Sequence, residues 1–188
     1  RWKELHQDLL PAIEEVRGHI GPIGFVGLWW DVEEPWQGAP HYHLAFRVDG
    51  PRLRRVGVQV RPPVPYTEVI PTMSQARVNI MTQRPLLRHL KHLTSKYFEL
   101  FCADTIPLVM LDPDHAALVY GPAGRELALH DGLHEGIGAK LVDVLRRPAH
   151  YQAVVEAVRR HLATHHSYQH RVRELVAALQ APVEAPST

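Results

Sequence analysis

The sequence has few cysteines, no long apolar run and almost no net charge, and each of these absences excludes a class of protein. Its 188 residues include a single cysteine, so no disulfide can form within the chain. No apolar run approaches the roughly 20 residues that a membrane-spanning helix needs, and no secretory signal precedes Pro11. Lys and Arg number 21 against 20 Asp and Glu, so no overall field attracts nucleic acid or anionic lipid. We therefore expect a cytoplasmic protein without a membrane span or a nucleic-acid partner.

The chain does have enough apolar residues to form a sizeable core. Its hydrophobic content is 45%, which for 188 residues predicts one domain. We expect this domain to cover residues 1–180 and to be followed by a flexible tail, 181–188, rich in Pro, Ala and Ser. Because the chain starts at Arg1 inside an amphipathic segment, we also expect it to be part of a longer polypeptide.

Short apolar segments alternate with helical patterns along the chain. Helices are predicted at residues 2–16, between 42 and 55 ahead of 49–51, at 66–76, within 94–104, at 134–146, from 148 to 158, and after Ser167. Strands are predicted at residues 23–30, 56–60, 77–81 and 106–111, with a fifth at 117–120 or 126–129. Since each strand is apolar throughout, the pattern predicts an α/β, Rossmann-like parallel sheet of five or six strands flanked by helices.

Segment 94–111 has the clearest functional pattern. Thr94 or Ser95 can cap a short helix, which leads into the buried strand that ends the segment. On this helix Lys96 and Glu99 are three residues apart, so both can face one side. An ammonium and a carboxylate at a helix N-terminus, beside a parallel sheet, suit the phosphates and ribose hydroxyls of a nucleotide. The alternative is an ordinary surface ion pair.

Other segments offer further candidates for binding. Gly24 and Gly27, in the first strand, permit close approach of a backbone or a ligand. Arg84 begins a basic stretch that continues through residues 88–96 and is interpreted either as a diphosphate site or as a solvated surface. Three tryptophans near the first loop can either stack on a sugar or base or cover the sheet edge: Trp29, Trp30 and Trp36.

The 14 histidines invite a metal hypothesis, which the spacing does not favour. His41 and His43 suit one face of a strand, but His165 and His166 are adjacent on a helix and so point apart. The carboxylates of 112–114 flank a proline and are interpreted as a turn. We therefore predict no metal site.

Two residues with functional chemistry are assigned to packing instead. Cys102 lies on the apolar face of the helix in 94–104, which favours burial over reactivity. The segment 165–171 is interpreted as a helix-capping cluster that places Tyr168 in the core.

Three segments resemble one enzyme family. Residues 64–80 are similar to a short helix leading into a strand in the C-terminal, donor-binding half of GT-B glycosyltransferases, especially the group like the spore maturation protein CgeB. Residues 96–109 resemble that group's pattern R-x-F-E-a-x-a-x-G-x-p-l-v, and 148–179 resemble its H-T-Y-x-x-R ending. Together the resemblance covers roughly residues 56–180.

This resemblance implies roles for individual residues. Glu99 matches the glutamate that accepts hydrogen bonds from the ribose of a nucleotide sugar, and Lys96 matches the basic position facing the phosphates. Residues 64–66 would border the base. The expected donor-binding set is Gly27, Tyr66, Arg84, Thr94, Lys96, Tyr97 and Glu99.

The implied function is transfer of a sugar from a nucleotide-sugar donor to an unknown acceptor. An N-terminal Rossmann-like domain or partner chain is expected to provide the rest of the cleft, with the general base; no catalytic residue is assigned here. The donor is the substrate, and no metal or other cofactor is expected. Lys91 and Asp104 stand where many members of the family have glutamate and glycine. These departures motivate the alternative, a non-catalytic interaction domain that retains the fold.

Overall fold

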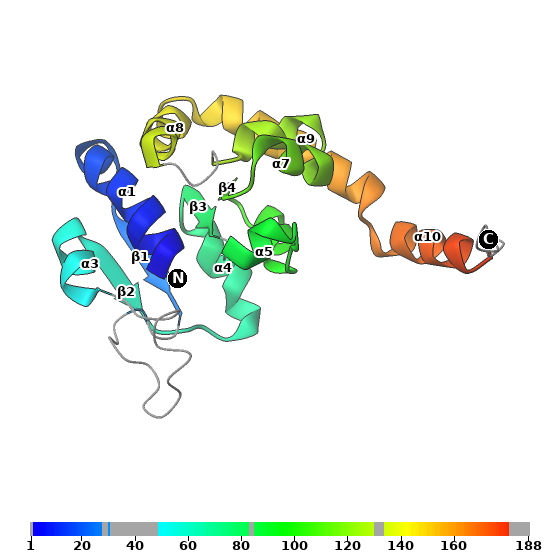
Figure 1. Ribbon diagram of the computed structural model, residues 1–188, viewed down its shortest axis with the longest axis horizontal. Coiled ribbons are helices and arrows are strands. Elements are labelled where there is room, and N and C mark those ends of the chain that lie inside the picture. Colours follow the sequence, from blue (N-terminus) through cyan, green and yellow to red (C-terminus); the bar gives the residue numbers. More distant parts are fainter. Residues whose placement is uncertain (1, 28–29, 31–48, 83–84, 130–133, 181–188) are drawn as a thin grey trace, which may run out of the picture.

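A computed structural model describes residues 2–27, 30, 49–82, 85–129 and 134–180. Helices predominate and short parallel strands lie between them, so the fold is mixed α/β, as the sequence predicts (Figure 1). Within these ranges, no helix combines the length and the apolar character that crossing a bilayer would require.

The N-terminal part pairs two strands beside a helix. The predicted helix is confirmed as the π-helix η1 (Trp2–Leu9), the α-helix α1 (Leu10–Val16) and the 3-10 turn η2 (Arg17–His19). Strand β1 (Ile23–Val26) then pairs in parallel with β2 (Val58–Arg61). The helix buries its apolar side against the core, which explains its helical spacing of apolar residues.

Helix α3 (Gly50–Val56) connects β1 to β2 and corrects the sequence prediction. A helix starts at this position instead of ending before it, because the Asp49 carboxylate accepts a hydrogen bond from the Arg52 N–H at 2.9 Å. Gly57 ends the helix with a left-handed φ of 75°, so the second strand starts after it and not at Val56. Residues 42–48 of the predicted helix lie outside the described ranges.

A second parallel pair follows. The 3-10 turn η3 (Tyr66–Glu68) and helix α4 (Val69–Ser74) confirm the helix predicted there and lead into β3 (Val78–Met81). Strand β3 pairs with β4 (Ile106–Val109), every residue of which is buried. The Asn79 side chain donates hydrogen bonds to the Met73 carbonyl and the Thr105 hydroxyl, at 2.8 and 2.9 Å, and so ties α4 to both strands.

Three short helical segments connect β3 to β4: α5 (Pro85–His89), α6 (Lys96–Glu99) and the 3-10 turn η4 (Leu100–Cys102). The predicted helix therefore tightens from α to 3-10 geometry after Glu99. This tightening changes which residues share a face. Phe101 stays buried, whereas Cys102 is exposed, so the prediction that the cysteine packs in the core is wrong.

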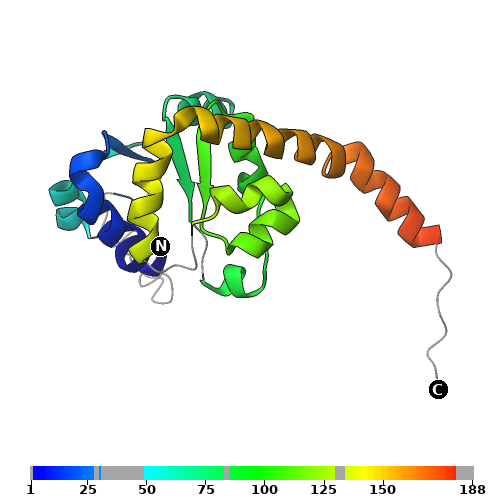
Figure 2. The ribbon, with the colours of Figure 1, turned by 90° about the horizontal axis from the view of Figure 1, so that it is seen from above.

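The predicted sheet of five or six strands is also wrong for the described residues. They form two separate two-stranded parallel sheets, β1 with β2 and β3 with β4. Figure 2 shows β3 and β4 side by side next to the long helix α9 (Pro148–His165), which packs on β4. An isolated parallel β-bridge joins Val109 of β4 to Ala128. Ala128 lies in the segment 126–129, one of the two candidates for the predicted fifth strand.

The other proposed fifth strand, 117–120, is helical. It belongs to α7 (Pro113–Tyr120), which starts because the Asp112 carboxylate accepts a hydrogen bond from the His115 N–H at 2.7 Å. The 112–114 motif, interpreted as a turn, is therefore a helix cap with proline at the first helical position. The 3-10 helix η5 (Pro122–Leu127) follows and packs against α7.

Three helices complete the fold: α8 (His134–Arg146), α9 (Pro148–His165) and α10 (Tyr168–Gln180). Helix α9 packs on β4, and α10 extends away from the body of the molecule (Figures 1 and 2). The predicted cap is confirmed, since the His170 N–H donates to the Ser167 hydroxyl at 3.2 Å. Tyr168 is 86% exposed, so the prediction that it lies in the core is wrong. The reason is that α10 extends away from the body and buries none of its residues (Figure 1).

Two buried histidines make the stability of this fold depend on pH. His6 and His115 are 4% and 6% exposed. Burial lowers the pKa of each below its ordinary value of 6.5, and Arg52 lowers that of His6 further. The Asp49 N–H also donates to Nε2 of His6 at 3.2 Å, and protonation at that nitrogen would remove the acceptor.

We expect the free energy of unfolding to fall as pH drops below 6.5, because the unfolded chain then binds more protons than the folded one. The urea midpoint should be lower at about pH 5.5 than at about pH 7.5. His6→Gln keeps an acceptor without titrating, so its midpoint should depend less on pH. The matched control is His19→Gln at an exposed site, which should behave as the wild type does. A midpoint that rises on acidification would contradict this prediction.

Candidate functional site

Helix α6 carries the two charged side chains that the sequence assigns to a nucleotide. Lys96 is exposed and Glu99 is half-buried. In the part of the chain that the structure describes, neither side chain forms a hydrogen bond or an ion pair with another residue. The alternative interpretation, an ion pair between Lys96 and Glu99, is therefore not observed. Both charged groups are available to a ligand.

The residues around this pair have structural roles. Ser95 is the N-cap of α6, but its side chain makes no capping hydrogen bond. Thr94 is exposed, and its carbonyl accepts a hydrogen bond from the Tyr97 N–H at 3.0 Å. The Tyr97 side chain is 3% exposed, and the Tyr120 hydroxyl donates to its carbonyl at 3.1 Å. Tyr97 thus anchors α6 to the core, and its side chain is not part of an open surface.

The other predicted donor residues lie apart from α6 in the chain. Gly27 follows β1 with a φ of 138°, and its N–H donates to the Arg61 carbonyl at 3.2 Å. A Cβ at Gly27 would lie 3.2 Å from Nε1 of Trp30, whose ring packs on Phe25 with centroids 4.7 Å apart. The close approach at this glycine is thus to a tryptophan. Tyr66 follows β2 and is 80% exposed.

Three candidates lie outside the described residues: Arg84, Trp29 and Trp36. Lys91, in the predicted basic stretch, is described and has a left-handed φ of 50°. Its N–H donates to the Arg88 carbonyl, and the His92 N–H donates to that of Leu87. This pair of bonds is the Schellman arrangement that closes a helix C-terminus. The backbone therefore ends α5 at Lys91, the position where the resemblance implies a second glutamate in many retaining enzymes.

A cavity of about 290 Å³ lies between η4 and α9. Its walls are mainly apolar, and they are formed by Phe98, Phe101, Cys102, Arg159, Leu162 and His166. The Arg159 guanidinium donates to the carbonyls of Phe101 and Ala103 at 2.9 and 2.6 Å, so it caps the end of η4. Lys96 and Glu99 do not line this cavity. None of the described residues of the predicted donor-binding set lines this cavity.

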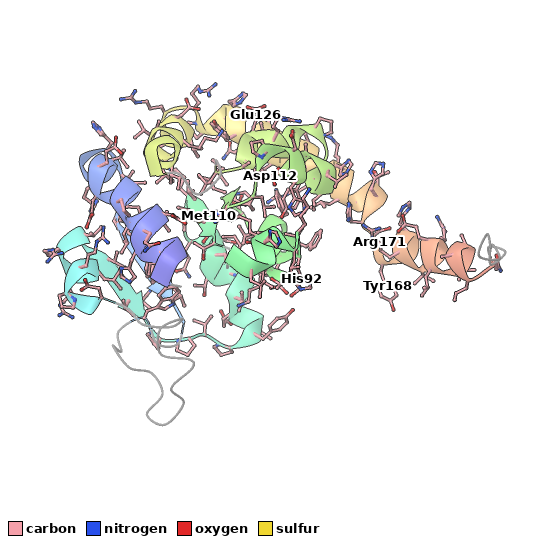
Figure 3. The ribbon with its side chains drawn as sticks, in the orientation of Figure 1. His92, Met110, Asp112, Glu126, Tyr168 and Arg171 are labelled. Atoms are coloured by element: carbon pink, nitrogen blue, oxygen red, sulfur yellow. The ribbon has the colours of Figure 1, made fainter. Side chains whose placement is uncertain are left out.

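A second cavity, of about 470 Å³, lies next to the carboxyl end of β4. In Figure 3, Met110 and Asp112 mark the chain as it leaves β4 and enters α7, and Glu126 marks η5. The residues that line the cavity come from α7, η5, the segment bridged to β4, and α8: Pro113, Arg125, Ala128, Gly136 and Lys140. Ligands of parallel sheets commonly bind beyond the carboxyl ends of the strands.

Sequence reasoning missed this second cavity. Arg125 and Lys140 belong to separate helices and match no spacing motif, so no local signal connects them. The described residues contain no cluster of three or more His, Cys, Asp or Glu side chains that could hold a metal ion. His41 and His43 lie outside those residues.

Comparison with known proteins gives one finding. A profile of the family described as glycosyl transferase-like matches residues 31–177, which is most of the chain and includes α6, β4 and both cavities. No curated protein and no solved structure matched. The chain therefore belongs to the glycosyl transferase-like family.

Proposed function

We propose that this chain is the donor-binding domain of a nucleotide-sugar glycosyltransferase, in which Glu99 binds the ribose and Lys96 lies near the phosphates. The observation that supports this most is Glu99, a partly exposed residue of α6 whose carboxylate is bonded to no other described residue. A carboxylate with no protein partner can accept hydrogen bonds from the donors of a ligand. Two ribose hydroxyls are such donors, and one carboxylate accepts both.

A finer assignment, the C-terminal half of a GT-B transferase of the CgeB-like group, is part of the same proposal. It is supported by the family match and by the order in which α6 leads into β4. In such an enzyme an N-terminal Rossmann-like domain, or a partner chain, contributes the acceptor site and the general base. The developing charge of the leaving diphosphate then needs a cation, and Lys96 is the candidate for this role.

The first test is Glu99→Ala. We expect this change to weaken binding of UDP, or of a UDP-, GDP- or dTDP-sugar, by about 1–3 kcal/mol, because hydrogen bonds to a charged carboxylate are lost. Isothermal titration calorimetry or ligand-observed NMR measures the affinity. The matched control is Glu156→Ala on the exposed side of α9, a carboxylate that also has no partner among the described residues. Equal affinity in both variants would remove Glu99 from the site.

A non-catalytic interaction domain is the second candidate, and α10 favours it. Leu175 and Leu179 are 60% and 77% exposed on this helix, a pattern expected where another surface is bound. The two candidates differ in one measurement. A donor-binding domain binds nucleotide sugars at millimolar concentration or below, whereas an interaction domain that has lost the chemistry does not.

A further inference from the structure

The cavity beside the end of β4 has cationic side chains on two of its walls. Arg125 comes from η5 and Lys140 from α8, so their presence on one cavity depends on how these helices pack. No residue of α6 lines this cavity, which therefore is a different place from the proposed ribose site. Its volume of about 470 Å³ is larger than a single small ion requires.

Lys140 is half-buried, and its charge is poorly compensated by the protein. Burial lowers its pKa, whereas Asp143 and Glu126 raise it. Both of these carboxylates are engaged elsewhere: Asp143 binds Arg147 and accepts a hydrogen bond from the Tyr151 hydroxyl at 2.6 Å, and Glu126 binds His150 at 2.6 Å. The Lys140 ammonium lies 4.9 Å from the centroid of the Tyr151 ring. Among the described residues it forms no ion pair of its own.

Arg125 is paired, but only at the surface. Its Nη1 lies 2.5 Å from Asp114, whose side chain is 82% exposed. Exposed pairs of this kind contribute at most about 1 kcal/mol, because water and salt screen them. A dianion in the cavity can therefore compete with Asp114 for this guanidinium.

The backbone adds to the positive potential. Pro113 occupies the first position of α7, and Gly136 lies in the first turn of α8 without a side chain, and both line the cavity. Helix N-termini carry a partial positive charge and favour anions. A planar guanidinium, a flexible ammonium and the first turn of α8 together suit the charge and oxygen atoms of a phosphate group, whereas the N-terminus of α7 is already capped by Asp112.

We propose that the cavity lined by Pro113, Arg125, Ala128, Gly136 and Lys140 binds a phosphate or diphosphate group, with Arg125 and Lys140 as its charged contacts. This inference does not depend on the proposed function, because the cavity excludes Glu99 and its ligand is tested as an ion. It predicts binding of inorganic pyrophosphate that weakens as salt is added.

Calorimetric titration of the whole chain with inorganic pyrophosphate tests the proposal. Lys140→Gln and Arg125→Gln should each weaken binding by about tenfold or more, since each loses a charge-assisted contact. Asp114→Asn should tighten binding, because it releases Arg125 from its competing partner. A variant that has lost its structure would not bind pyrophosphate more tightly, so misfolding cannot explain this result. The matched control is Arg160→Gln, at an exposed arginine on α9 that does not line the cavity, and it should bind as the wild type does.

Several results would overturn the proposal: no pyrophosphate binding by the wild type at millimolar concentration, unchanged affinity in both Lys140→Gln and Arg125→Gln, or weaker binding in Asp114→Asn. Circular dichroism identifies any variant that fails to fold. If Lys140→Gln fails to fold, Arg125→Gln, at a residue 56% exposed, and Asp114→Asn decide the outcome.

Titration with UDP then shows whether the phosphate belongs to the nucleotide-sugar donor or to another molecule. If Lys140→Gln and Glu99→Gln both weaken UDP binding, the cavity holds the diphosphate of the donor. If only Glu99→Gln does so, while Lys140→Gln still weakens pyrophosphate binding, the cavity takes the phosphate of another molecule, such as a phosphorylated acceptor. If pyrophosphate binds and UDP does not, the proposed function fails and this site remains.

Discussion

Replacement of Leu108 by alanine is expected to lower the free energy of unfolding by about 2–5 kcal/mol. Leu108 is completely buried in β4 and pairs with Ile80 of β3. The substitution removes apolar contacts and leaves a cavity that packed neighbours fill only in part. Since a domain is stable by only about 5–15 kcal/mol, this loss is a large share of the total.

Urea denaturation followed by circular dichroism measures this loss, with Leu118→Ala as the matched control. Leu118 lies on α7 and is 76% exposed, so its truncation should change stability by less than about 0.5 kcal/mol. Similar losses in the two variants would contradict the central position of β4. The same comparison bears on function, because β4 leads directly to the cavity that contains Arg125 and Lys140.

Gly124→Ala is expected to destabilise the chain by about 1–3 kcal/mol, through overpacking and not through loss of contacts. A Cβ at this position would lie 2.5 Å from Cβ of Tyr120 and 2.8 Å from the carbonyl oxygen of Ala116. Both atoms belong to α7, and Ala116 and Tyr120 are completely buried, so they have little room to move. The expected result is a lower melting temperature.

Gly18→Ala is the control for the glycine effect itself. A Cβ at Gly18 would meet no atom within 4 Å, so this change should be neutral or slightly stabilising. Gly124→Ala should also weaken pyrophosphate binding, because Arg125 is its neighbour on η5 and moves with it. Equal melting temperatures for the two variants would show that α7 and η5 do not approach each other as closely as described.

Much of the helical structure follows from signals between near neighbours. Ser167 caps α10, and the apolar spacing of residues 2–16 produces η1 and α1, as predicted. Local signals also explain two errors. A helix was expected ahead of 49–51 and a turn at 112–114, yet Asp49 and Asp112 each cap a helix by accepting a hydrogen bond from the N–H three residues later. Aspartate followed by proline within two residues suits a helix start as well as a turn.

Some features of the candidate site could also be predicted from the sequence, and others could not. The position of Lys96 and Glu99 on one short helix was predictable, because a capping residue and helical spacing mark that helix in the sequence. The burial of Tyr97 was not, since it depends on contacts with Tyr120 in α7. Exposure of Tyr168 and Cys102 likewise depends on where α10 leaves the body and where α6 tightens into η4.

Residue order alone was therefore enough to predict a mixed α/β chain, most of the described helices, the segments that become β3 and β4, and the position of Lys96 and Glu99 on one short helix. These features depend on periodicity and capping, which act over a few residues. Strand pairing and the cavity that Arg125 and Lys140 both line depend on packing between segments that are distant in the chain. Many alternative pairings satisfy the same local patterns, so only the folded structure selects among them.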